Sequence, residues 1–234
     1  MVATSIIVPC YNEAERGKAF IHELANFCKT NLADYEVILI DDGSTDKTYE
    51  LIARAAATDK ENIRVLRNDV NLGKGATVMR GVFESSGNVV LFIDADGATC
   101  AEQIPKLLRQ LENNDIVIGY RYSKQSTVIQ PVVRLITGTL FNLYVNMIFR
   151  LHIYDCLCGF KGFQRNVARD LFADLIDKRW LFDVEVLYKA KMKGYRIKTL
   201  PTHWVHKAGT KIKLLDPLIF IIQLLLLKRE IDKR

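Results

Sequence analysis

Acidic residues gather at positions where apolar segments of the chain end. The run Asp41–Asp46 directly follows one such segment, Asp94 and Asp96 follow a second, and Glu13 follows a third. Residues two apart in an extended segment point in the same direction. Asp94 and Asp96 can therefore hold a hard divalent cation, with coordination positions left open for phosphate oxygens, as Mg²⁺ prefers. Carboxylates that meet at one edge repel each other unless a cation or a hydrogen-bonding ligand lies between them.

The run Asp41–Asp46 also has a purely structural interpretation. Asp-Gly-Ser-Thr-Asp is a turn sequence followed by a helix cap, with Ser44, Thr45 or Asp46 as the capping residue. An Asp-x-Asp pair is likewise weak evidence when it stands alone. The residue types leave both interpretations open.

Short β-branched runs alternate with helical patterns in the first half of the chain, which is typical of parallel βαβ units. We expect strands at 4–9, 35–41, 63–66, 88–94 and 115–120. We expect helices at 14–30, 46–58 and 102–112, and another that opens at a glycine-bearing turn and ends at Phe83. This pattern predicts an α/β fold with a doubly wound, mostly parallel sheet, flanking helices and ligands bound outside the carboxyl ends of the strands.

The second half of the chain is less regular. Helical patterns cover 131–150, 167–175 and 182–193, a strand is expected at 195–200, and 154–163 is expected to be irregular. No internal repeat or low-complexity linker interrupts the chain. We expect one domain over residues 1–213, followed by a C-terminal amphipathic helix over 214–234.

Composition excludes several classes of protein. The chain has 234 residues, of which 49% are hydrophobic and 26% charged, so a disordered chain, a collagen-like repeat and a small disulfide scaffold are excluded. Its net charge of +6 suits an anionic partner such as a nucleotide phosphate, a lipid headgroup or a nucleic acid. The five cysteines lack zinc spacing and are odd in number, which favours a reducing compartment.

The longest apolar run is Leu218–Leu227, which is broken only by Gln223. As a helix it would cover roughly 15 Å, about half of a hydrocarbon core of about 30 Å, so it cannot span a membrane alone. Basic residues on both sides would let it lie on a membrane surface, whereas a helix docked on the core is the alternative. At the other end, Thr4–Pro9 is too short an apolar run for a secretory signal.

Four motifs follow one another along the chain, namely Val8–Glu13, Asp41–Asp46, Asn71–Gly75 and Asp94–Asp96. Together they resemble the family 2 glycosyltransferases of the GT-A fold. Two later segments, Cys158–Phe163 and Arg179–Glu185, resemble the branch that uses polyprenyl phosphates, the dolichyl-phosphate mannose and glucose synthases. The resemblance extends over about residues 3–213.

The resemblance implies a nucleotide-sugar site. Its residues would be Pro9, Tyr11, Glu13, Asp42, Lys74, Gly75, Asp94, Ala95 and Asp96. Asp42 would accept hydrogen bonds from the base, and Lys74 and Gly75 would lie beside the nucleotide. Asp94 and Asp96 would meet the diphosphate and hold Mg²⁺ or Mn²⁺, with Asp96 as the main ligand.

Two sequence features distinguish this chain from the mannose synthases and bear on the identity of the sugar donor. Ala98 stands where mannose synthases often carry Gln, so the metal shell has one protein ligand fewer. The segment Asp94–Thr99 is more similar to the glucose synthases. These features favour UDP-glucose as the donor, with GDP-mannose next.

Arg121, Arg134 and Lys211 lie in regions where the resembled enzymes hold the acceptor phosphate, although a solvated basic surface is the alternative. A lipid phosphate is largely a dianion at pH 7 and needs no strong general base. It needs cations that relieve its repulsion from the donor diphosphate. We therefore expect inverting transfer to a polyprenyl or dolichyl phosphate by a peripheral protein at the cytoplasmic side of a membrane. Whether the chain forms an oligomer or uses a membrane-anchor subunit is left open.

Other functions account for fewer of the sequence motifs. A family 2 enzyme acting on a saccharide or protein hydroxyl would need a base, for which Asp183 or Glu185 could serve. A processive polysaccharide synthase would carry Gln where Ile176 stands, and a nucleotidyltransferase would carry a glycine-rich basic loop after the first strand. A nucleic-acid-binding protein would leave the acidic edge unexplained, so we expect no nucleic acid as partner.

Overall fold

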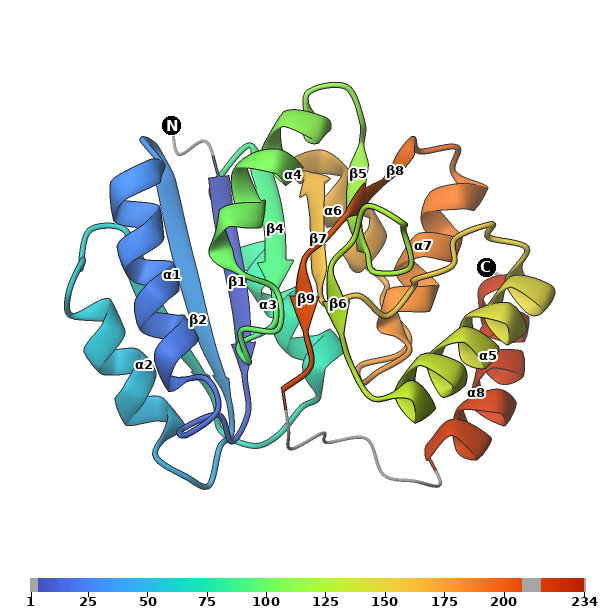
Figure 1. Ribbon diagram of the computed structural model, residues 1–234, viewed down its shortest axis with the longest axis horizontal. Coiled ribbons are helices and arrows are strands. Elements are labelled where there is room, and N and C mark those ends of the chain that lie inside the picture. The colour runs from blue at the N-terminus through green and yellow to red at the C-terminus, as the bar shows by residue number, and fades with distance from the viewer. Residues whose placement is uncertain (1–3, 208–215, 234) are drawn as a thin grey trace.

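A seven-stranded sheet runs through the structure, a computed structural model that describes residues 4–207 and 216–233 (Figure 1). For Arg134 and residues 216–219 only the backbone is described. The strands are β1 Thr4–Cys10, β2 Tyr35–Asp42, β3 Ile63–Asn68, β4 Val89–Ile93, β5 Ile116–Tyr120, β6 Val128–Ile129, β7 Phe160–Gln164, β8 Ile197–Pro201 and β9 Trp204–Val205. The helices are α1 Lys18–Asn31, α2 Thr48–Ala56, α3 Lys74–Glu84, α4 Ile104–Leu111, α5 Val132–Phe149, α6 Arg165–Phe172, α7 Phe182–Met192 and α8 Asp216–Ile231, and a short 3₁₀ turn at Ala101–Gln103 precedes α4.

The strand order in the large sheet is β3-β2-β1-β4-β7-β5-β8. All neighbours are parallel except β7, which is antiparallel to both β4 and β5. A second, two-stranded sheet of β6 and β9 lies across the first in Figure 1. The predicted α/β fold with a mostly parallel, doubly wound sheet and flanking helices is therefore confirmed.

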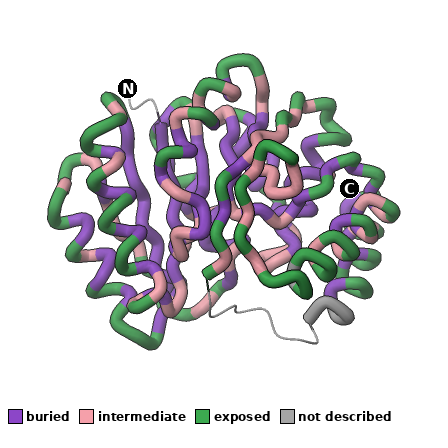
Figure 2. The backbone as a smooth tube through the Cα atoms, viewed as in Figure 1, coloured by how far each residue is buried: buried purple, intermediate pink, exposed green. Residues whose placement is uncertain are grey.

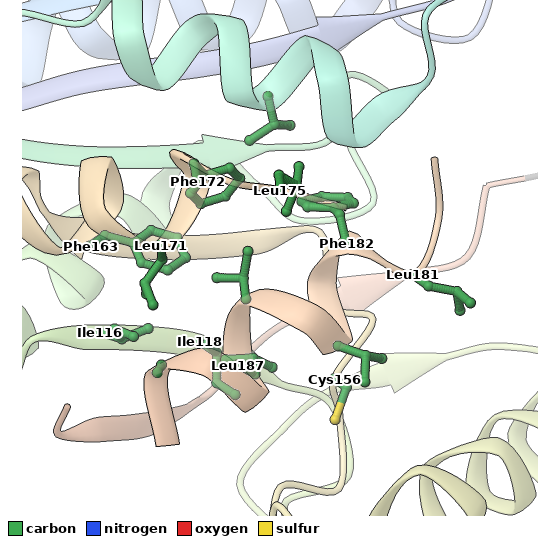
Figure 3. Packing of buried hydrophobic residues seen from close by; sticks show 14 of the residues in the cluster. Ile116, Ile118, Cys156, Phe163, Leu171, Phe172, Leu175, Leu181, Phe182 and Leu187 are labelled. Carbon is green, nitrogen blue, oxygen red and sulfur yellow. The ribbon is translucent and has the colours of Figure 1, made fainter. Parts of the chain in front are cut away.

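Helices cover both faces of the sheet because alternate strand residues point to opposite sides. Ile6 and Val8 of β1 pack in a core with α1, α2 and α4, whereas Ile7 packs in a second core with α3, α6 and α7. Figure 3 shows part of this second core, where the labelled rings of Phe163 and Phe172 lie close together. Their centroids are 5.9 Å apart in an edge-to-face arrangement.

The segment expected to be irregular at 154–163 contains part of a strand, so that expectation is wrong. Phe160–Gln164 forms β7 between β4 and β5, with Leu91 opposite Gly162. A five-residue segment that contains both a buried lysine and a glycine lacks the apolar alternation of an ordinary strand. Its two neighbours hold it in place instead, and Gly162 leaves room for Leu107 of α4, because a Cβ there would lie 2.3 Å from that side chain.

Elsewhere the observed ends of helices and strands differ by a few residues from those expected from the sequence. The first helix was expected from Ala14 but begins at Lys18, after a turn in which Gly17 N donates to Glu13 O at 2.8 Å. The two-residue strands β6 and β9 were not predicted, since two residues carry no periodic pattern.

Helix α8 packs on the core by one face. Phe220, Leu224, Leu227 and Ile231 are buried in the same core as α7, and Tyr144 Oη of α5 donates to Ile221 O at 3.2 Å. Figure 1 shows α5 and α8 side by side at one end of the molecule. The docked-helix interpretation is correct for this face. The domain boundary expected at 213/214 lies outside the described residues and stays a prediction.

The opposite faces of α5 and α8 are apolar and exposed, and they are largely green in Figure 2. The exposed large side chains on these two helices are Val132, Val133, Leu135, Ile136, Leu140, Leu143, Met147, Ile221, Ile222, Leu225 and Leu226. We call this set the apolar platform. Among the described residues, no helix is both long and apolar enough to cross a membrane.

Candidate active site

A cavity of about 490 Å³ opens at the carboxyl ends of β1, β2 and β4. Its lining residues are Pro9, Cys10, Tyr11, Glu13, Arg16, Asp42, Asn71, Gly73, Lys74, Asp94, Ala95, Asp96, Arg179, Trp180, Trp204, His206 and Lys207. Every residue expected in the nucleotide-sugar site lines it except Gly75. We call it the donor cavity.

Gly75 contributes to the site indirectly. Its backbone N donates to Arg179 O at 3.1 Å. A Cβ on Gly75 would lie 2.8 Å from Asp177 O and 2.9 Å from the Phe182 side chain. The glycine therefore lets the segment before α7 pack against the first turn of α3, instead of contacting the cavity as expected.

Asp94 follows β4 and lies against β7. Its backbone N donates to Gly159 O at 3.0 Å, and its side-chain Oδ1 is 2.6 Å from Lys74 Nζ. A Cβ on Gly159 would lie only 1.9 Å from Asp94 Oδ2. Gly159 therefore makes the room that the Asp94 carboxylate occupies.

Asp96 lies beside Asp94 at the same edge. Its Oδ1 accepts a hydrogen bond from Ala98 N at 3.0 Å, and its Oδ2 is 4.0 Å from Arg16 Nη2. Burial and then the charge of Asp94 raise the pKa of Asp96. The charge of Asp94 thus disfavours the ionised form of Asp96, in line with the repulsion expected between carboxylates at one edge.

Glu13 reaches the cavity together with Arg16. Glu13 is buried, and its two carboxylate oxygens accept hydrogen bonds from Arg16 Nε at 2.8 Å and Arg16 Nη2 at 2.5 Å. The hydrogen bond to Glu13 raises the pKa of Arg16. The sequence analysis did not identify Arg16, although its spacing of three from Glu13 was a usable signal.

Asp42 is buried in the cavity wall, and its carboxylate accepts four hydrogen bonds from protein donors. Asn68 Nδ2 and Leu72 N donate to Oδ1 at 2.8 and 2.9 Å, while Asn71 Nδ2 and Gly73 N both donate to Oδ2 at 3.0 Å. Both oxygens therefore have protein donors within the loop that leads into α3. Its expected contact with a nucleobase stays a prediction.

The turn-and-cap interpretation of this motif also has support. Asp46 Oδ1 accepts a hydrogen bond from Thr48 N at 2.9 Å at the start of α2. Asp41 Oδ1 likewise accepts from Ser44 N at 3.1 Å. One acidic motif thus forms the turn, the cap and part of the cavity wall.

A second, smaller cavity of about 100 Å³ adjoins the first and shares five lining residues with it. These shared residues are Lys74, Asp94, Asp96, Trp180 and Trp204. Arg121, Leu157, Gly159, Asp183 and Phe220 complete its wall. We call it the inner cavity.

Arg121 is held rigidly in the wall of the inner cavity. Its Nη2 is 2.6 Å from Asp155 Oδ1, and its Nε donates to Asp155 Oδ2 at 3.0 Å. Its guanidinium carbon lies 5.1 Å from the centre of the Trp204 ring. Of the other two cations expected at an acceptor phosphate, Arg134 is described by its backbone in α5 alone, and Lys211 lies outside the described residues.

The two acidic residues considered as general bases lie in different surroundings. Asp183 lines the inner cavity, but its Oδ1 is 2.5 Å from the buried Lys161 Nζ. Burial raises the pKa of Asp183, against the opposing charges of Lys161 and Lys74. Glu185 is fully buried away from both cavities, where it accepts hydrogen bonds from two backbone amides and pairs with Lys189 at 2.7 Å.

The acidic pair suits a divalent cation. Among the described residues, no group of three or more His, Cys, Asp or Glu side chains could hold a metal ion. Mg²⁺ and comparable ions are commonly bound by one or two carboxylates, with phosphates and water completing the shell. Asp94, whose side chain is partly exposed, and Asp96 at the cavity edge match that pattern.

Several lining residues were not identified as site residues. Arg179 and Trp180 belong to a motif that resembles the polyprenyl-phosphate branch, so their identity was a usable signal. Trp204 and His206 were given no role, yet both line the donor cavity with ring centroids 6.0 Å apart. They arrive there because β9 pairs with β6, which local sequence patterns do not indicate.

Comparison with known proteins agrees with the arrangement of these motifs. The family model described as "Glycosyl transferase family 2" matches residues 5–172. A Dictyostelium discoideum protein named dolichyl-phosphate beta-glucosyltransferase is 36% identical over 234 residues, which cover 94% of this chain and 71% of that protein. The human protein of the same name is 33% identical over 223 residues, covering 89% of this chain and 69% of the human one.

Solved structures share the fold at low sequence identity. Glucosyl-3-phosphoglycerate synthase from Mycobacterium tuberculosis, in complex with Mn²⁺, UDP and glucosyl-3-phosphoglycerate, has a TM-score of 0.69 at 18% identity. The match covers 97% of this chain and 78% of that one. Its complex with Mg²⁺ and UDP has a TM-score of 0.71, also at 18% identity. This similarity concerns the fold.

Proposed function

The chain belongs to glycosyltransferase family 2, and from that membership we propose that it transfers a hexose, preferably from UDP-glucose, to a polyprenyl or dolichyl phosphate. One observation carries the proposal. The donor cavity, with its acidic pair, shares five lining residues with an inner cavity whose wall includes Arg121 and Phe220 of α8. A nucleotide site and an anion site thus meet beside the apolar platform.

The donor cavity suits a nucleotide sugar in size and charge. Its volume of about 490 Å³ lies within the usual range for small-ligand sites. Arg16, Lys74, Arg179 and Lys207 supply positive charge around the acidic pair. Relatives named dolichyl-phosphate beta-glucosyltransferase support glucose as the sugar, and structural neighbours solved with UDP support uridine as the nucleoside.

Transfer needs a nucleophile, and a lipid phosphate brings its own. At pH 7 it is largely a dianion, so no protein group has to remove a proton. Arg121, oriented by Asp155, would bind this phosphate in the inner cavity and reduce its repulsion from the donor. A phosphate oxygen then forms a bond to the anomeric carbon while the bond to the diphosphate breaks, which inverts an α-linked sugar to a β-linked sugar phosphate.

The leaving diphosphate carries away the electron pair of the broken bond. Mg²⁺ or Mn²⁺ held by Asp94 and Asp96 would supply charge neutralisation there. Lys74 and Arg16, whose ammonium and guanidinium groups lie beside the two carboxylates, would add positive charge to the same region. Trp180 and Trp204 line both cavities and would limit water at the reacting centre.

The apolar platform supports a membrane surface as the place of reaction. A polyprenyl phosphate keeps its chain in the bilayer, so the inner cavity must lie within reach of the headgroups. Phe220 of α8 lines that cavity, and exposed side chains of α5 and α8 surround the same end of the molecule. Binding by this surface, without spanning, would make the chain peripheral, and the cytoplasmic side of the membrane is part of the proposal.

A second candidate acceptor is a hydroxyl of a saccharide or a protein. Asp183 favours it, because a carboxylate in the inner cavity could take a proton. Its ion pair with the buried Lys161 weighs against that role, since proton transfer to Asp183 would leave Lys161 buried without a negative partner.

A transfer assay distinguishes the two acceptors. Radiolabelled UDP-glucose with Mn²⁺ is offered to a polyprenyl phosphate in detergent and, separately, to free saccharides, and lipid-extractable label is counted. We expect label in the lipid fraction only. Thermal shifts with UDP-glucose, GDP-mannose and UDP-N-acetylglucosamine identify the donor, because a ligand at a hundred times its dissociation constant stabilises the fold by about 2.7 kcal/mol. Transfer to saccharide alone would contradict the proposal.

A further inference from the structure

The acidic pair of the donor cavity is neutralised by cations of the chain itself. Lys74 Nζ is 2.6 Å from Asp94 Oδ1, and Arg16 Nη2 is 4.0 Å from Asp96 Oδ2. The Lys74 pair is the tighter of the two, and Asp94, like Asp96, lines both the donor and the inner cavity. An ammonium group at this distance would compete with a divalent cation for the same oxygen.

A second carboxylate, that of Asp183, lines the inner cavity together with Lys74. Burial acts to lower the pKa of Lys74, but the charges of Asp94 and Asp183 outweigh it and raise that pKa. Asp183 is in turn anchored by Lys161, whose Nζ is 2.5 Å from Asp183 Oδ1 and donates to Cys158 O at 2.6 Å. Lys161 thus pairs with Asp183 and Lys74 pairs with Asp94, and Asp183 and Lys74 both line the inner cavity.

The surroundings of Lys74 allow its ammonium group to move while its backbone stays fixed. It is the first residue of α3, and the next residue, Gly75, donates its N–H to Arg179 O. The Lys74 Nζ lies 5.8 Å from the centre of the Phe92 ring and 6.0 Å from that of Phe182. The flexible four-carbon stem of a lysine can change rotamer without disturbing the helix.

We propose that Lys74 is an exchangeable counter-ion, which neutralises Asp94 in the free enzyme and turns to the donor phosphates when Asp94 takes a divalent cation. Asp183, fixed by Lys161, is the positioning residue that keeps Lys74 within the cavities after it leaves Asp94. The identity of the donor as a nucleoside diphosphate sugar rests on the proposed function. The competition between Lys74 and a cation for Asp94 does not depend on the proposed function.

The exchange makes nucleotide and metal binding cooperative. In the free enzyme a cation must displace Lys74 from Asp94, whereas with a diphosphate present Lys74 already has another anionic partner. Nucleotide therefore strengthens cation binding, and by linkage the cation strengthens nucleotide binding by the same factor. Part of this coupling should disappear when the lysine charge is removed.

Manganese binding tests the exchange directly. Free Mn²⁺ is measured by electron paramagnetic resonance during titration of the full chain, with and without UDP, for the wild type, Lys74→Met and the control Lys106→Met. Lys106 is an exposed residue of α4, so its substitution removes the same charge away from the cavities. We expect Lys74→Met to bind Mn²⁺ alone about tenfold more tightly and to lose about tenfold of the strengthening by UDP. Lys106→Met should match the wild type.

The outcomes separate the exchange from the proposed function. Unchanged or weaker binding of Mn²⁺ alone by Lys74→Met would overturn the exchange, whatever the nucleotide does. Failure of UDP to bind the wild type would count against the proposed donor and leave the Mn²⁺ comparison valid. If Lys74→Met melts well below the wild type, Lys74→Gln replaces it, because its amide keeps a polar tip without a charge. In the wild type, UDP that binds without strengthening Mn²⁺ binding would also overturn the proposal.

Discussion

At the scale of single residues, the position of Asp94 depends on a neighbour that has no side chain. Asp94 Oδ2 occupies the volume that a Cβ on Gly159 would need, and the clash distance of 1.9 Å is far below any real contact. Lys74 holds the other carboxylate oxygen. The absence of a side chain at Gly159 therefore controls where the Asp94 carboxylate lies.

The substitution Gly159→Ala should displace the Asp94 carboxylate. We expect a loss of transfer rate of about a hundredfold, comparable to the loss of one electrostatic group at the reacting centre. Binding of UDP without metal should stay close to that of the wild type, since Gly159 lines the inner cavity and not the donor cavity. Initial rates and calorimetric titration measure the two effects, and full activity of the variant would mean that Asp94 is not required at its observed position.

Asp96→Asn should abolish nearly all transfer while the fold stays intact. The substitution keeps the size of the side chain and removes one charge from the cation site, a change worth about 3 kcal/mol or roughly a hundredfold or more in rate. Asp34→Asn, at an exposed position, is the matched control. Initial rates and melting temperatures are compared, and near-normal turnover by Asp96→Asn would remove Asp96 from the cation site.

Asp42→Ala should weaken binding of UDP by about 1.5–3 kcal/mol, the usual range for hydrogen bonds to a charged group. The four donors that Asp42 now holds would lose their acceptor, so the loop Asn71–Gly73 would no longer be fixed beside the cavity. Asn71→Ala removes one of these donors and should have a smaller effect in the same direction. Unchanged UDP affinity in Asp42→Ala would show that the motif serves only as a turn and cap.

At the scale of elements, α8 has a buried face that packs on the core and an exposed apolar face, and binding of the exposed face to a membrane stays a prediction. Phe220 and Leu224 are buried in the core, whereas Ile222 and Leu226 are exposed. Deleting the helix would therefore unfold part of the core and would not isolate its outer face. Substitutions on the exposed face are the appropriate test of membrane binding.

Leu140→Glu on α5 and Leu226→Glu on α8 should each weaken binding to phospholipid vesicles. Their side chains are 60% and 59% exposed, so a carboxylate is tolerated by the fold but costly at a bilayer surface. Phe83→Glu, at an exposed apolar position on α3, is the control and should bind vesicles normally. Vesicle co-sedimentation measures binding. Equal binding by all four proteins would exclude the apolar platform as the membrane contact.

The same pair of variants should separate long acceptors from short ones. Transfer to a long-chain polyprenyl phosphate in vesicles should fall with vesicle binding, whereas transfer to a short, water-soluble analogue should persist. The reason is that neither Leu140 nor Leu226 lines the donor cavity or the inner cavity. Parallel loss of both activities would indicate damage to the catalytic site.

At the scale of the whole molecule, the net charge of +6 predicts that vesicle binding depends on salt. Each basic residue near an anionic leaflet contributes about 1 kcal/mol, and this attraction decays over about 10 Å at 0.1 M salt. We expect binding to anionic vesicles to weaken as NaCl is raised from about 50 to about 500 mM, because salt screens the attraction between basic residues and the anionic leaflet. The contribution of apolar contacts to binding should persist. Binding that does not change with salt would mean that apolar contacts alone hold the protein on the bilayer.

Much of the donor cavity could be predicted from the sequence because it is built on parallel strands. Glu13, Asp42 and Asp94 each follow an apolar segment, and the carboxyl ends of parallel strands meet at one edge. Local periodicity is enough to place such strands, so motifs far apart in the chain could be brought together without coordinates. The family resemblance then gave each position an expected role.

The partners of those residues could not be predicted, because they depend on contacts across long sequence separations. Strand β7 exists only between β4 and β5, and Trp204 reaches the cavities through the pairing of β9 with β6. The Lys161–Asp183 pair joins a strand and a helix that no local pattern connects.

The sequence by itself determined which chemistry is present and on which edge of the sheet it lies, because strand and helix periodicities are local properties. Only the tertiary structure decided which charge faces which. Lys74 meets Asp94, Lys161 meets Asp183 and Asp155 holds Arg121 because separate segments pack there, and the energy of an ion pair depends on distance and burial rather than on residue type.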